Sequence, residues 1–478
     1  MPAEGERGTA FQVGMLAGRA VLQWHVAEPG PRLAELLAEL DLQSLEKLDD
    51  YDVVEFVAAA ERIASWAHHL AARGAAELST RESMTPSIDH ELALDLPPDR
   101  VAGAELGLRL GTSPRAGREL VRLGLAFHSC LAPTGDALAA GRIDVQKARA
   151  IVDGLHSVPT QLAVVVQDAV LPRAHTRTAR QLAGDVRAAL VQLDPDEAAQ
   201  RHAEAAKTRY LGRPVPLPDG MAGMWLRTTA PEAHALYSAV DEAARAARRA
   251  GDSRTIDQLR ADLVCEGLGR GERSRLRVDV RVLVPLSTLL GSSEEPGELA
   301  GYGPIDPDTA RSLARGGTWR RLVTDPASGT VLDVGRSRYE PPAELAELVR
   351  QRDRTCVSPT CDTSAWSCEL DHTEAFRPDE VEGGSTSAGN LGPLSKGCHL
   401  LKTHAGFELE QPSPGEFLWT TPTGHRYARD PVPAAPGLDP RSPIHALRKD
   451  LADLARPPEP PPPRGTAIDP KDLGPPPF

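Results

Sequence analysis

One stretch of under fifty residues, from 356 to 404, constrains the fold of this chain more than any other. It holds four of the six cysteines together with a concentration of carboxylate, amide and imidazole side chains: Cys356, Cys361, Cys368, Cys398, Asp371, His372, Asn390, His399 and His404. Thiols and imidazoles crowded at this spacing are typical of a metal site rather than of core packing. We therefore expect residues 356–404, in the C-terminal third of the chain, to form a small fold around bound metal.

The overall composition favours several helical domains. The 478 residues exceed what one hydrophobic core holds, so we expect roughly two to four domains. Aromatic residues make up only 4%, and Ala and Leu are abundant, which favours helices packed through small side chains over a β-sandwich. A net charge of −13 argues against a broadly basic surface, although a local basic cleft for DNA is still compatible with it.

The sequence carries no signal for a membrane or for export. No apolar run approaches the roughly 18 residues needed to span a bilayer. The start of the chain is acidic and interrupted, unlike a signal peptide with its basic head and apolar core. We expect a cytoplasmic protein, in which a reducing environment favours metal binding by clustered thiols over disulfides.

Changes of pattern divide the chain into five parts. Residues 1–30 suggest a flexible leader, and apolar residues at helical spacing predict a helical bundle over 31–207. Helical and short strand patterns alternate over 208–340, which predicts a small α+β subdomain. Residues 341–430 contain the cysteine-rich stretch, and the proline-rich residues 431–478 are expected to form a disordered tail.

The cysteines and the helix that follows them predict two separate ligand groups. Cys356 and Cys361 lie either side of a proline turn, where they can present two thiolates to one zinc ion. The segment SKGCHLLKTH predicts a helix, on which His399 is rotated by about 100° from Cys398. One turn can therefore direct Cys398 to a structural zinc and His399 to a separate catalytic ion.

The Asp371-His372 pair lies at the end of a predicted strand. Neighbours in a regular strand point to opposite faces, so both reach one site only where the strand twists or ends. Asp371 can supply an oxygen ligand to a divalent ion, and neutral His372 can take a proton from water. In the alternative, Asp371 only orients His372. Asn390 follows in a loop of small residues, either bonded across that loop behind His372 or as an ordinary turn residue.

Taken together, these residues resemble the HNH motif of the ββα-metal nucleases, whose small fold is two strands and a helix around one divalent ion. Further segments are similar to those of bacterial proteins of the thirteen-E-twelve repeat family, in which a helical domain of unknown function precedes an HNH unit. These segments are ALAAGRIDVQKARAI, LDPDEAAQR, RTIDQLRADL, AGYGPIDPDTAR and TDPASGTVLDVGRSRYEPP. The resemblance covers about residues 35–430. It implies a mainly α fold, in which a helical bundle is followed by a small α+β subdomain, a C-terminal ββα-metal (HNH) domain and a disordered proline-rich tail.

The resemblance also implies a role for each residue of the motif. His372 matches the general base, and Asn390 matches the middle position of the motif. Asp371 and His399 match the ligands of the catalytic ion. We therefore expect His372 and Asn390 to act in catalysis and Asp371 and His399 to bind the metal.

A structural zinc site is implied by the same resemblance. Cys356 and Cys361 match the first half of a zinc knuckle. The chain departs from the commonest form of the motif at Ser395 and Cys398, which leaves one zinc ligand missing or replaced. Cys368 is then the candidate for the fourth thiolate beside Cys356, Cys361 and Cys398.

These roles imply a metal-dependent endonuclease that hydrolyses DNA phosphodiester bonds with one divalent cation, Mg, Mn or another transition metal. Lys396 and Lys402 are candidates to contact phosphates. An alternative is a catalytically inactive nucleic-acid or protein-binding module with a zinc-stabilised HNH fold, which the acidic balance of residues 341–430 favours. A third possibility is a purely structural helical protein stabilised by zinc. This interpretation agrees with the predicted helical bundle but does not explain the Asp371-His372 pair.

Overall fold

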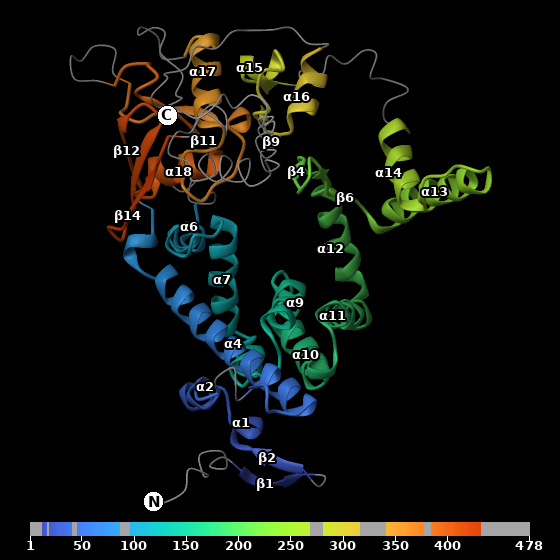
Figure 1. The fold of residues 1–478 in the computed structure, drawn as a ribbon. Helices are drawn as coiled ribbons and strands as arrows, with labels where there is room; N and C mark the ends of the chain where they lie inside the picture. The colour runs from blue at the N-terminus through green and yellow to red at the C-terminus, as the bar shows by residue number, and fades with distance from the viewer. Residues whose placement is uncertain are drawn as a thin grey trace, which may run out of the picture.

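The computed structural model describes residues 12–16, 19–40, 45–86, 96–267, 281–315, 341–376 and 384–431. Over these ranges the chain is mainly helical, as the sequence predicts, with small antiparallel sheets near its start and in its C-terminal half (Figure 1). The proline-rich tail beyond residue 431 and a hairpin predicted over 319–335 lie outside the described residues. In the described part, no helix has both the length and the apolar character needed to cross a membrane.

The N-terminal residues form structure where a flexible leader was expected over 1–30. Strands β1 (Gln12–Leu16) and β2 (Arg19–Leu22) pair antiparallel, and α1 (Gln23–Val26) and α2 (Pro31–Ala38) follow. Trp24 is buried with Leu33 and Leu36 against the first half of the long helix α4 (Asp50–Ser79). The described residues of this segment thus form paired strands and a short helix, and the buried Trp24 packs that helix against α2 and α4.

Helices make up most of the described residues over 31–207. After α4 and the short η1 (Glu82–Met84), these are α6 (Pro98–Leu110), α7 (Pro114–Phe127), α8 (Ala132–Ala139), α9 (Val145–Leu155), α10 (Thr160–Val170), η2 (Leu171–Thr176), α11 (Ala179–Leu193) and α12 (Pro195–Lys207). Side-chain caps begin several of these helices; Ser113, for example, accepts from the amide of Ala116. Small residues let the helices approach closely, since a methyl group at Gly117 would lie 2.1 Å from the carbonyl oxygen of Gly103.

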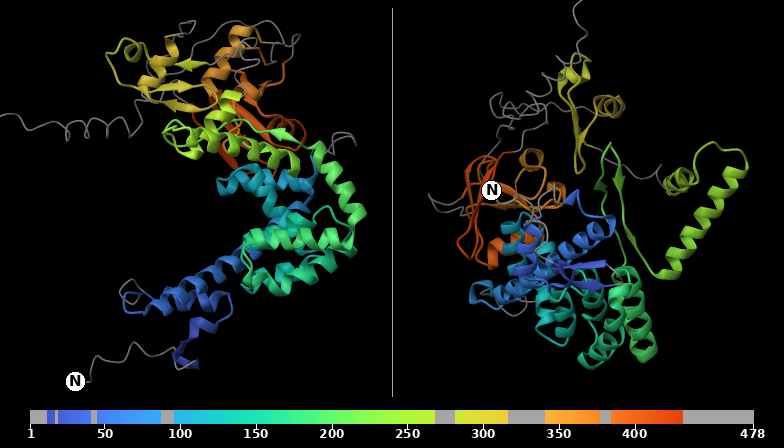
Figure 2. Two further views of the ribbon diagram at one scale, coloured as in Figure 1. Left: turned by 90° about the vertical axis from the view of Figure 1, so that its right-hand side faces the viewer. Right: turned by 60° about the horizontal axis from the view of Figure 1, so that its bottom comes forward.

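The described residues in the middle of the chain form both short strands and helices. Its first part contains short strands and two helices: β3 (Tyr210–Leu211), β4 (Val215–Pro216), β5 (Ala222–Gly223), β6 (Leu226–Arg227), α13 (Ala230–Arg249) and α14 (Ile256–Gly267). The second part is a three-stranded antiparallel sheet with two helices: β7 (Val282–Leu283), α15 (Leu286–Leu289), β8 (Gly297–Leu299), β9 (Gly303–Ile305) and α16 (Pro307–Ala314). In Figures 1 and 2, α13 and α14 stand apart from the bundle.

The C-terminal part begins with α17 (Ala343–Asp353) and η3 (Ala365–Ser367). Strands β10 (Glu369–His372) and β11 (Leu391–Leu394) pair antiparallel, with His372 opposite Leu391, and α18 (Lys396–His404) packs against both strands. A three-stranded antiparallel sheet follows, made of β12 (Glu408–Ser413), β13 (Glu416–Thr420) and β14 (Arg426–Arg429).

The C-terminal part shares one hydrophobic core with helix α6 of the bundle. Val101 and Leu108 of α6 lie in the same buried cluster as Leu401 of α18 and Phe417 and Trp419 of β13. The boundary is also hydrogen-bonded, because the buried carboxylate of Glu105 accepts from Thr421 Oγ1 at 2.8 Å and from Thr423 Oγ1 at 2.6 Å. The bundle and the C-terminal part, which the sequence pattern separates, are thus packed as one unit.

We expect Glu105→Ala to destabilise the whole protein. The substitution removes a buried acceptor, so the Thr421 hydroxyl loses its bond to the carboxylate. We expect the free energy of unfolding to fall by about 1–3 kcal/mol. Chemical denaturation followed by circular dichroism measures the change. Glu77→Ala, on the exposed face of α4, is the control and should change stability by less than about 0.5 kcal/mol. Equal stability of the two variants would show that Glu105 does not join the parts.

Candidate metal centre and neighbouring site

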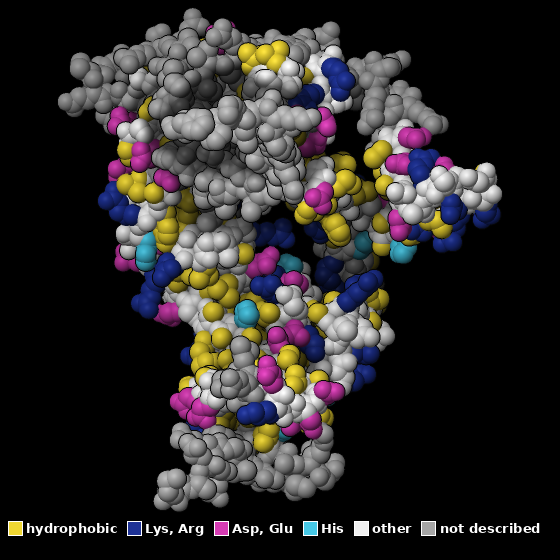
Figure 3. Space-filling model, viewed as in Figure 1, with side chains coloured by type: hydrophobic (Ala, Val, Ile, Leu, Met, Phe, Trp, Pro, Cys, Tyr) yellow, Lys and Arg dark blue, Asp and Glu magenta, His cyan; other side chains and the backbone are white. Residues whose placement is uncertain are grey.

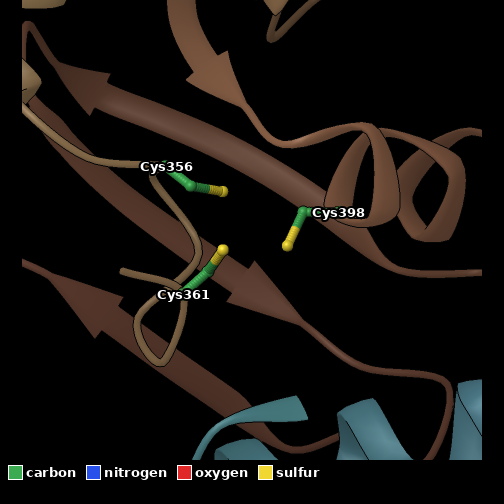
Figure 4. Close-up of side chains that lie close together, drawn as sticks. All are labelled: Cys356, Cys361 and Cys398. Atoms are coloured by element: carbon green, nitrogen blue, oxygen red, sulfur yellow. The ribbon is translucent and has the colours of Figure 1, made fainter. Parts of the chain in front are cut away.

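Three cysteines converge where the loop after α17 meets the start of α18. The sulfur atoms of Cys356, Cys361 and Cys398 all lie within 4.8 Å of one another, and Cys356 and Cys398 are buried. Figure 4 shows the three side chains directed toward a common point. A tetrahedral zinc ion with bonds of about 2.3 Å holds its sulfur ligands roughly 3.8 Å apart, so the donor set and its spacing suit such an ion. The predicted thiol site therefore has three members that can hold a metal such as zinc.

The backbone around the thiols holds them in place. Cys356 donates its amide to the carbonyl of Thr363 at 2.7 Å, and Cys361 donates to the carbonyl of Ser358 at 3.1 Å, which closes the turn between the two cysteines. Ser395 begins α18, because its hydroxyl accepts from the amide of Cys398 at 3.3 Å. Its own amide donates to the sulfur of Cys356 at 3.3 Å. Ser395 therefore joins the two halves of the thiol group without adding a thiolate.

The thiols affect one another's protonation. Hydrogen bonds from Cys361, Cys368 and Cys398 hold the pKa of Cys356 far below its ordinary value, because they favour its thiolate. The pKa of Cys398 is raised, first by its hydrogen bonds to Cys356 and Cys361 and then by burial. Several thiolates this close repel one another unless a cation lies among them, which is the electrostatic situation that a bound divalent metal relieves.

Cys368 lies beside this group rather than within it. It is buried and hydrogen-bonds with Cys356, and its thiol also donates to the carbonyl of Thr363 at 3.7 Å. The set of three sulfurs within 4.8 Å does not include it. The structure thus brings together three of the four predicted zinc ligands and places the fourth next to Cys356.

A second group of side chains lies on the other side of Cys398, between β10 and α18. His399 Nε2 is 3.5 Å from Asp371 Oδ1, and His399 Nδ1 is 2.6 Å from Glu369 Oε2. Strand alternation places Glu369 and Asp371 on the same face of β10, the face toward α18. Lys402, one turn after His399, donates to Asp371 Oδ2 at 2.6 Å and to the carbonyl of His372 at 2.5 Å. Asp371 and His399, the two predicted ligands of a catalytic ion, are therefore brought together.

His372 is buried, with an exposed fraction of 7%, and makes different contacts from its neighbour Asp371. Its Nε2 lies 2.9 Å from Thr386 Oγ1, and its ring centre is 5.5 Å from that of Phe376. Burial lowers the pKa of His372, because it disfavours the charged ring, while Asp371 raises that pKa and Lys402 lowers it. The imidazole is therefore held in its neutral form close to the charges of the Asp371 group.

Asn390 fixes the backbone after His372. Its Oδ1 accepts from the amide of Glu374 at 2.7 Å, and its Nδ2 donates to the carbonyls of Glu374 and Ser385, both at 3.0 Å. A methyl group at Gly384 would lie 2.1 Å from the carbonyl oxygen of Glu374, so the two ends of the loop approach too closely for a side chain there. Asn390 thus connects both ends of the loop that follows His372.

The two lysines predicted to contact phosphate have different surroundings. Lys396 is exposed at the start of α18. Lys402 is half-buried, and its ammonium group is bonded to Asp371 and to the carbonyl of His372. The structure therefore leaves Lys396 accessible to an anion and assigns Lys402 a contact within the site.

The roles of three residues in this region were not predicted from the sequence: the contact of Glu369 with His399, the contact of Thr386 with His372, and the capping of α18 by Ser395. The first had a signal in the sequence, since ELDH alternates in a way that puts Glu369 on the same face as Asp371. Thr386 lies in a loop whose path depends on Asn390, so no local pattern indicates its contact with His372.

These features describe a mainly helical protein with a thiol centre where its bundle meets its C-terminal sheets. Residues 34–353 match the family described as a domain of unknown function, DUF222, and the chain belongs to this family. The thiol centre, from Cys356 to Cys398, follows directly after the matched residues.

Two curated relatives come from Mycobacterium tuberculosis strain H37Rv. The chain is 32% identical over 166 residues to the uncharacterized protein Rv3776, a stretch that covers 34% of this chain and 30% of that protein. It is 34% identical over 143 residues to the uncharacterized protein Rv2100, covering 29% of this chain and 24% of that protein. The chain thus spans less than a third of the length of these relatives. No solved structure matches the chain.

We expect the purified protein to contain tightly bound zinc that depends on the thiol group. Cys361→Ser removes one of three converging thiols, so zinc affinity should fall by at least the roughly 10- to 100-fold that loss of an outer partner costs. Metal analysis after dialysis against a weak chelator measures the loss. Cys265→Ser changes the exposed cysteine of α14 and should leave the zinc content unchanged.

Cys368→Ser separates a three-thiolate site from a four-thiolate one. A loss of zinc as large as that in Cys361→Ser would make Cys368 a ligand, whereas an unchanged content would limit the protein ligands to three thiolates. Retention of zinc by Cys361→Ser itself would contradict the thiol site.

Proposed function

We propose that the protein is a metal-dependent endonuclease of the HNH type that hydrolyses DNA phosphodiester bonds. The observation that carries the proposal is the 3.5 Å approach of His399 Nε2 to Asp371 Oδ1. Two ligand atoms of one divalent ion lie roughly 3 Å apart when each bond is about 2.1 Å long, so this separation suits a shared ion. Buried His372 lies next to Asp371 in the strand, and Asn390 fixes the backbone that follows it.

Asp371 and His399 would hold the divalent cation, which is Mg, Mn or another transition metal. When bound, the cation supplies positive charge that offsets the charge developing on the phosphate and on the leaving 3′ oxygen. Glu369 accepts the hydrogen of His399 Nδ1, and this selects the tautomer whose Nε2 lone pair is directed toward Asp371. Glu369 is thus a positioning residue, because it acts through the ring of His399.

His372 would take the proton from the attacking water. Its lowered pKa keeps the ring neutral at pH 7, so the ring can accept a proton. The tautomer in which Nε2 donates to Thr386 carries its lone pair on Nδ1, the atom that would receive the proton. Asn390 holds the backbone of this segment through Glu374, and Lys396 at the exposed start of α18 would contact the DNA backbone.

One observation favours the second candidate function, a catalytically inactive nucleic-acid or protein-binding module. Lys402 Nζ lies 2.6 Å from Asp371 Oδ2 and already neutralises the carboxylate that would bind the ion. In this alternative, the ion pair replaces the metal and the thiol centre alone stabilises the region. When manganese or magnesium is added, the endonuclease would cut DNA, whereas the inactive module would leave DNA uncut.

We expect His372→Ala to lower the rate of nicking of supercoiled plasmid by about 10²- to 10⁴-fold, because the general base is lost. Nicking is measured with Mn²⁺ or Mg²⁺ and with a chelator control, and the circular dichroism spectrum and zinc content should stay unchanged. The control, His404→Ala, alters a half-buried histidine at the end of α18 and should nick like the parent protein. Equal nicking by His372→Ala would rule this mechanism out.

We expect Glu369→Gln to raise the Mn²⁺ concentration for half-maximal nicking by about 10- to 100-fold, since His399 loses its charged orienting partner. The rate at saturating Mn²⁺ should change much less, because the ligands themselves are retained. Glu408→Gln, on the exposed end of β12, is the matched control. An unchanged half-maximal concentration in Glu369→Gln would show that the 2.6 Å contact does not position His399.

A further inference from the structure

Residues 208–267, here called the ribbon module, expose an unusual amount of apolar surface. They comprise the paired strands β3 to β6 and the helices α13 and α14. Of the 25 large apolar residues exposed in the described part of the chain, 11 belong to this module: Tyr210, Leu211, Val215, Leu217, Met221, Met224, Trp225, Leu226, Leu236, Tyr237 and Val264. Figure 3 shows apolar side chains gathered over β4 and β6. Surfaces of this kind usually mark a contact with another molecule.

The strands of the module form a two-stranded ribbon, whose contacts with the rest of the described chain include the bond from Tyr302 Oη to the carbonyl of Leu217 at 3.1 Å. β3 pairs with β6 and β4 pairs with β5, and the turn between them has Asp219 and Gly220 at positive φ. Among the described strands, none pairs with an outer edge of this ribbon. A lone two-stranded hairpin is at best marginally stable in water, and three strands or a covering layer are normally needed. Trp225, with an exposed fraction of 70%, has no such cover.

Helix α13 has an apolar stripe that its partner covers only in part. Ala233, Leu236, Tyr237, Val240 and Ala244 follow the spacing of one helix face. The end of the stripe is covered, since Ala244 is fully buried, but Leu236 and Tyr237 are exposed by 48% and 57%. The shorter α14 packs against α13 and places the Arg260 guanidinium over the Tyr237 ring, 5.4 Å from its centre, but it leaves Leu236 and much of Tyr237 exposed.

The charges of the module argue against a nucleic-acid partner. Its 60 residues contain eight arginines and eight acidic residues, so its net charge is zero. Arginines of the two helices and of the turn between them are bonded to acidic neighbours: Arg245 to Asp241 at 2.8 Å, Arg254 to Asp262 at 2.6 Å and Arg260 to Asp257 at 2.5 Å. Phosphate backbones are bound by an excess of cations, which this surface lacks.

We infer that the ribbon module is the contact surface for a second copy of this chain. Its 11 apolar side chains, each about half exposed, present on the order of 800 Å² over both faces of the ribbon and the two helices, about what one partner buries in an interface of standard size. A neutral surface meets its own copy without like-charge repulsion, although the whole chain carries a net charge of −13. Two antiparallel strand edges also pair across a two-fold axis, so the same ribbon can serve both partners. This interface does not depend on the nuclease proposal.

The test is the mass of the full-length protein in solution. Sedimentation velocity or light scattering over a concentration series should give twice the 51.1 kDa mass of one chain at micromolar concentration. Met221→Glu with Trp225→Glu places charges on the ribbon and should weaken dimerisation by about 100-fold or more. Val54→Glu with Leu290→Glu changes two similarly exposed residues outside the module and should remain dimeric.

Three results would overturn the inference. The parent protein could stay monomeric at tens of micromolar, or the ribbon variant could dimerise as well as the parent. In the third, the parent protein is monomeric and binds DNA at low salt, and the ribbon variant no longer binds DNA. This result would show that the surface binds nucleic acid. Circular dichroism checks that both double variants are folded, and both change exposed residues only.

Discussion

The convergence of three thiols between a loop and a helix start is the constraint on which the C-terminal part depends. Cys356 and Cys361 belong to the loop after α17, and Cys398 belongs to the first turn of α18, so a shared ion would tie these elements together. Structural zinc contributes directly to the folding free energy of small units of this kind. Because His399 follows Cys398, the same anchor fixes the side of α18 that faces Asp371. A metal ion held by the thiols would therefore help to orient His399 toward Asp371, the other candidate ligand of a second ion.

The bundle contributes to this arrangement from the far side of the thiols. Val101 and Leu108 of α6 pack in the same cluster as Cys356, Cys398 and Trp419. The indole of Trp419 in turn donates to the carbonyl of Val357, beside the first thiol, at 3.0 Å. The helical domain of the DUF222 family and the cysteine-rich part thus have one core, which gives a physical reason for their occurrence in one chain. A substitution in α6 would therefore change the packing around Cys356 and Cys398.

Local patterns in the sequence predicted the helical bundle and the position of Cys398 and His399 on one helix turn. The 3.6-residue period and the capping residues are local signals, and such signals are sufficient to predict individual helices. The buried pairing of Glu105 with Thr421 joins residues 316 positions apart, so no local period contains it. The bond between Lys402 and Asp371 was missed for a related reason, because the sequence does not show which side chain fills the space between strand and helix. The pairing of β1 with β2 and the burial of Trp24 were not predicted, since no repeating apolar pattern marks these residues.

One turn of α18 would serve two separate ions, with thiolates on one side and Asp371 and His399 on the other. Anomalous diffraction from crystals soaked in Mn²⁺, recorded at the zinc and manganese absorption edges, tests this most directly. The predicted result is a zinc peak among Cys356, Cys361 and Cys398 and a distinct manganese peak between Asp371 Oδ1 and His399 Nε2, with Lys402 displaced. A manganese-soaked crystal with no peak at Asp371 and with the Lys402 contact intact would show that Asp371 and His399 do not bind a second ion.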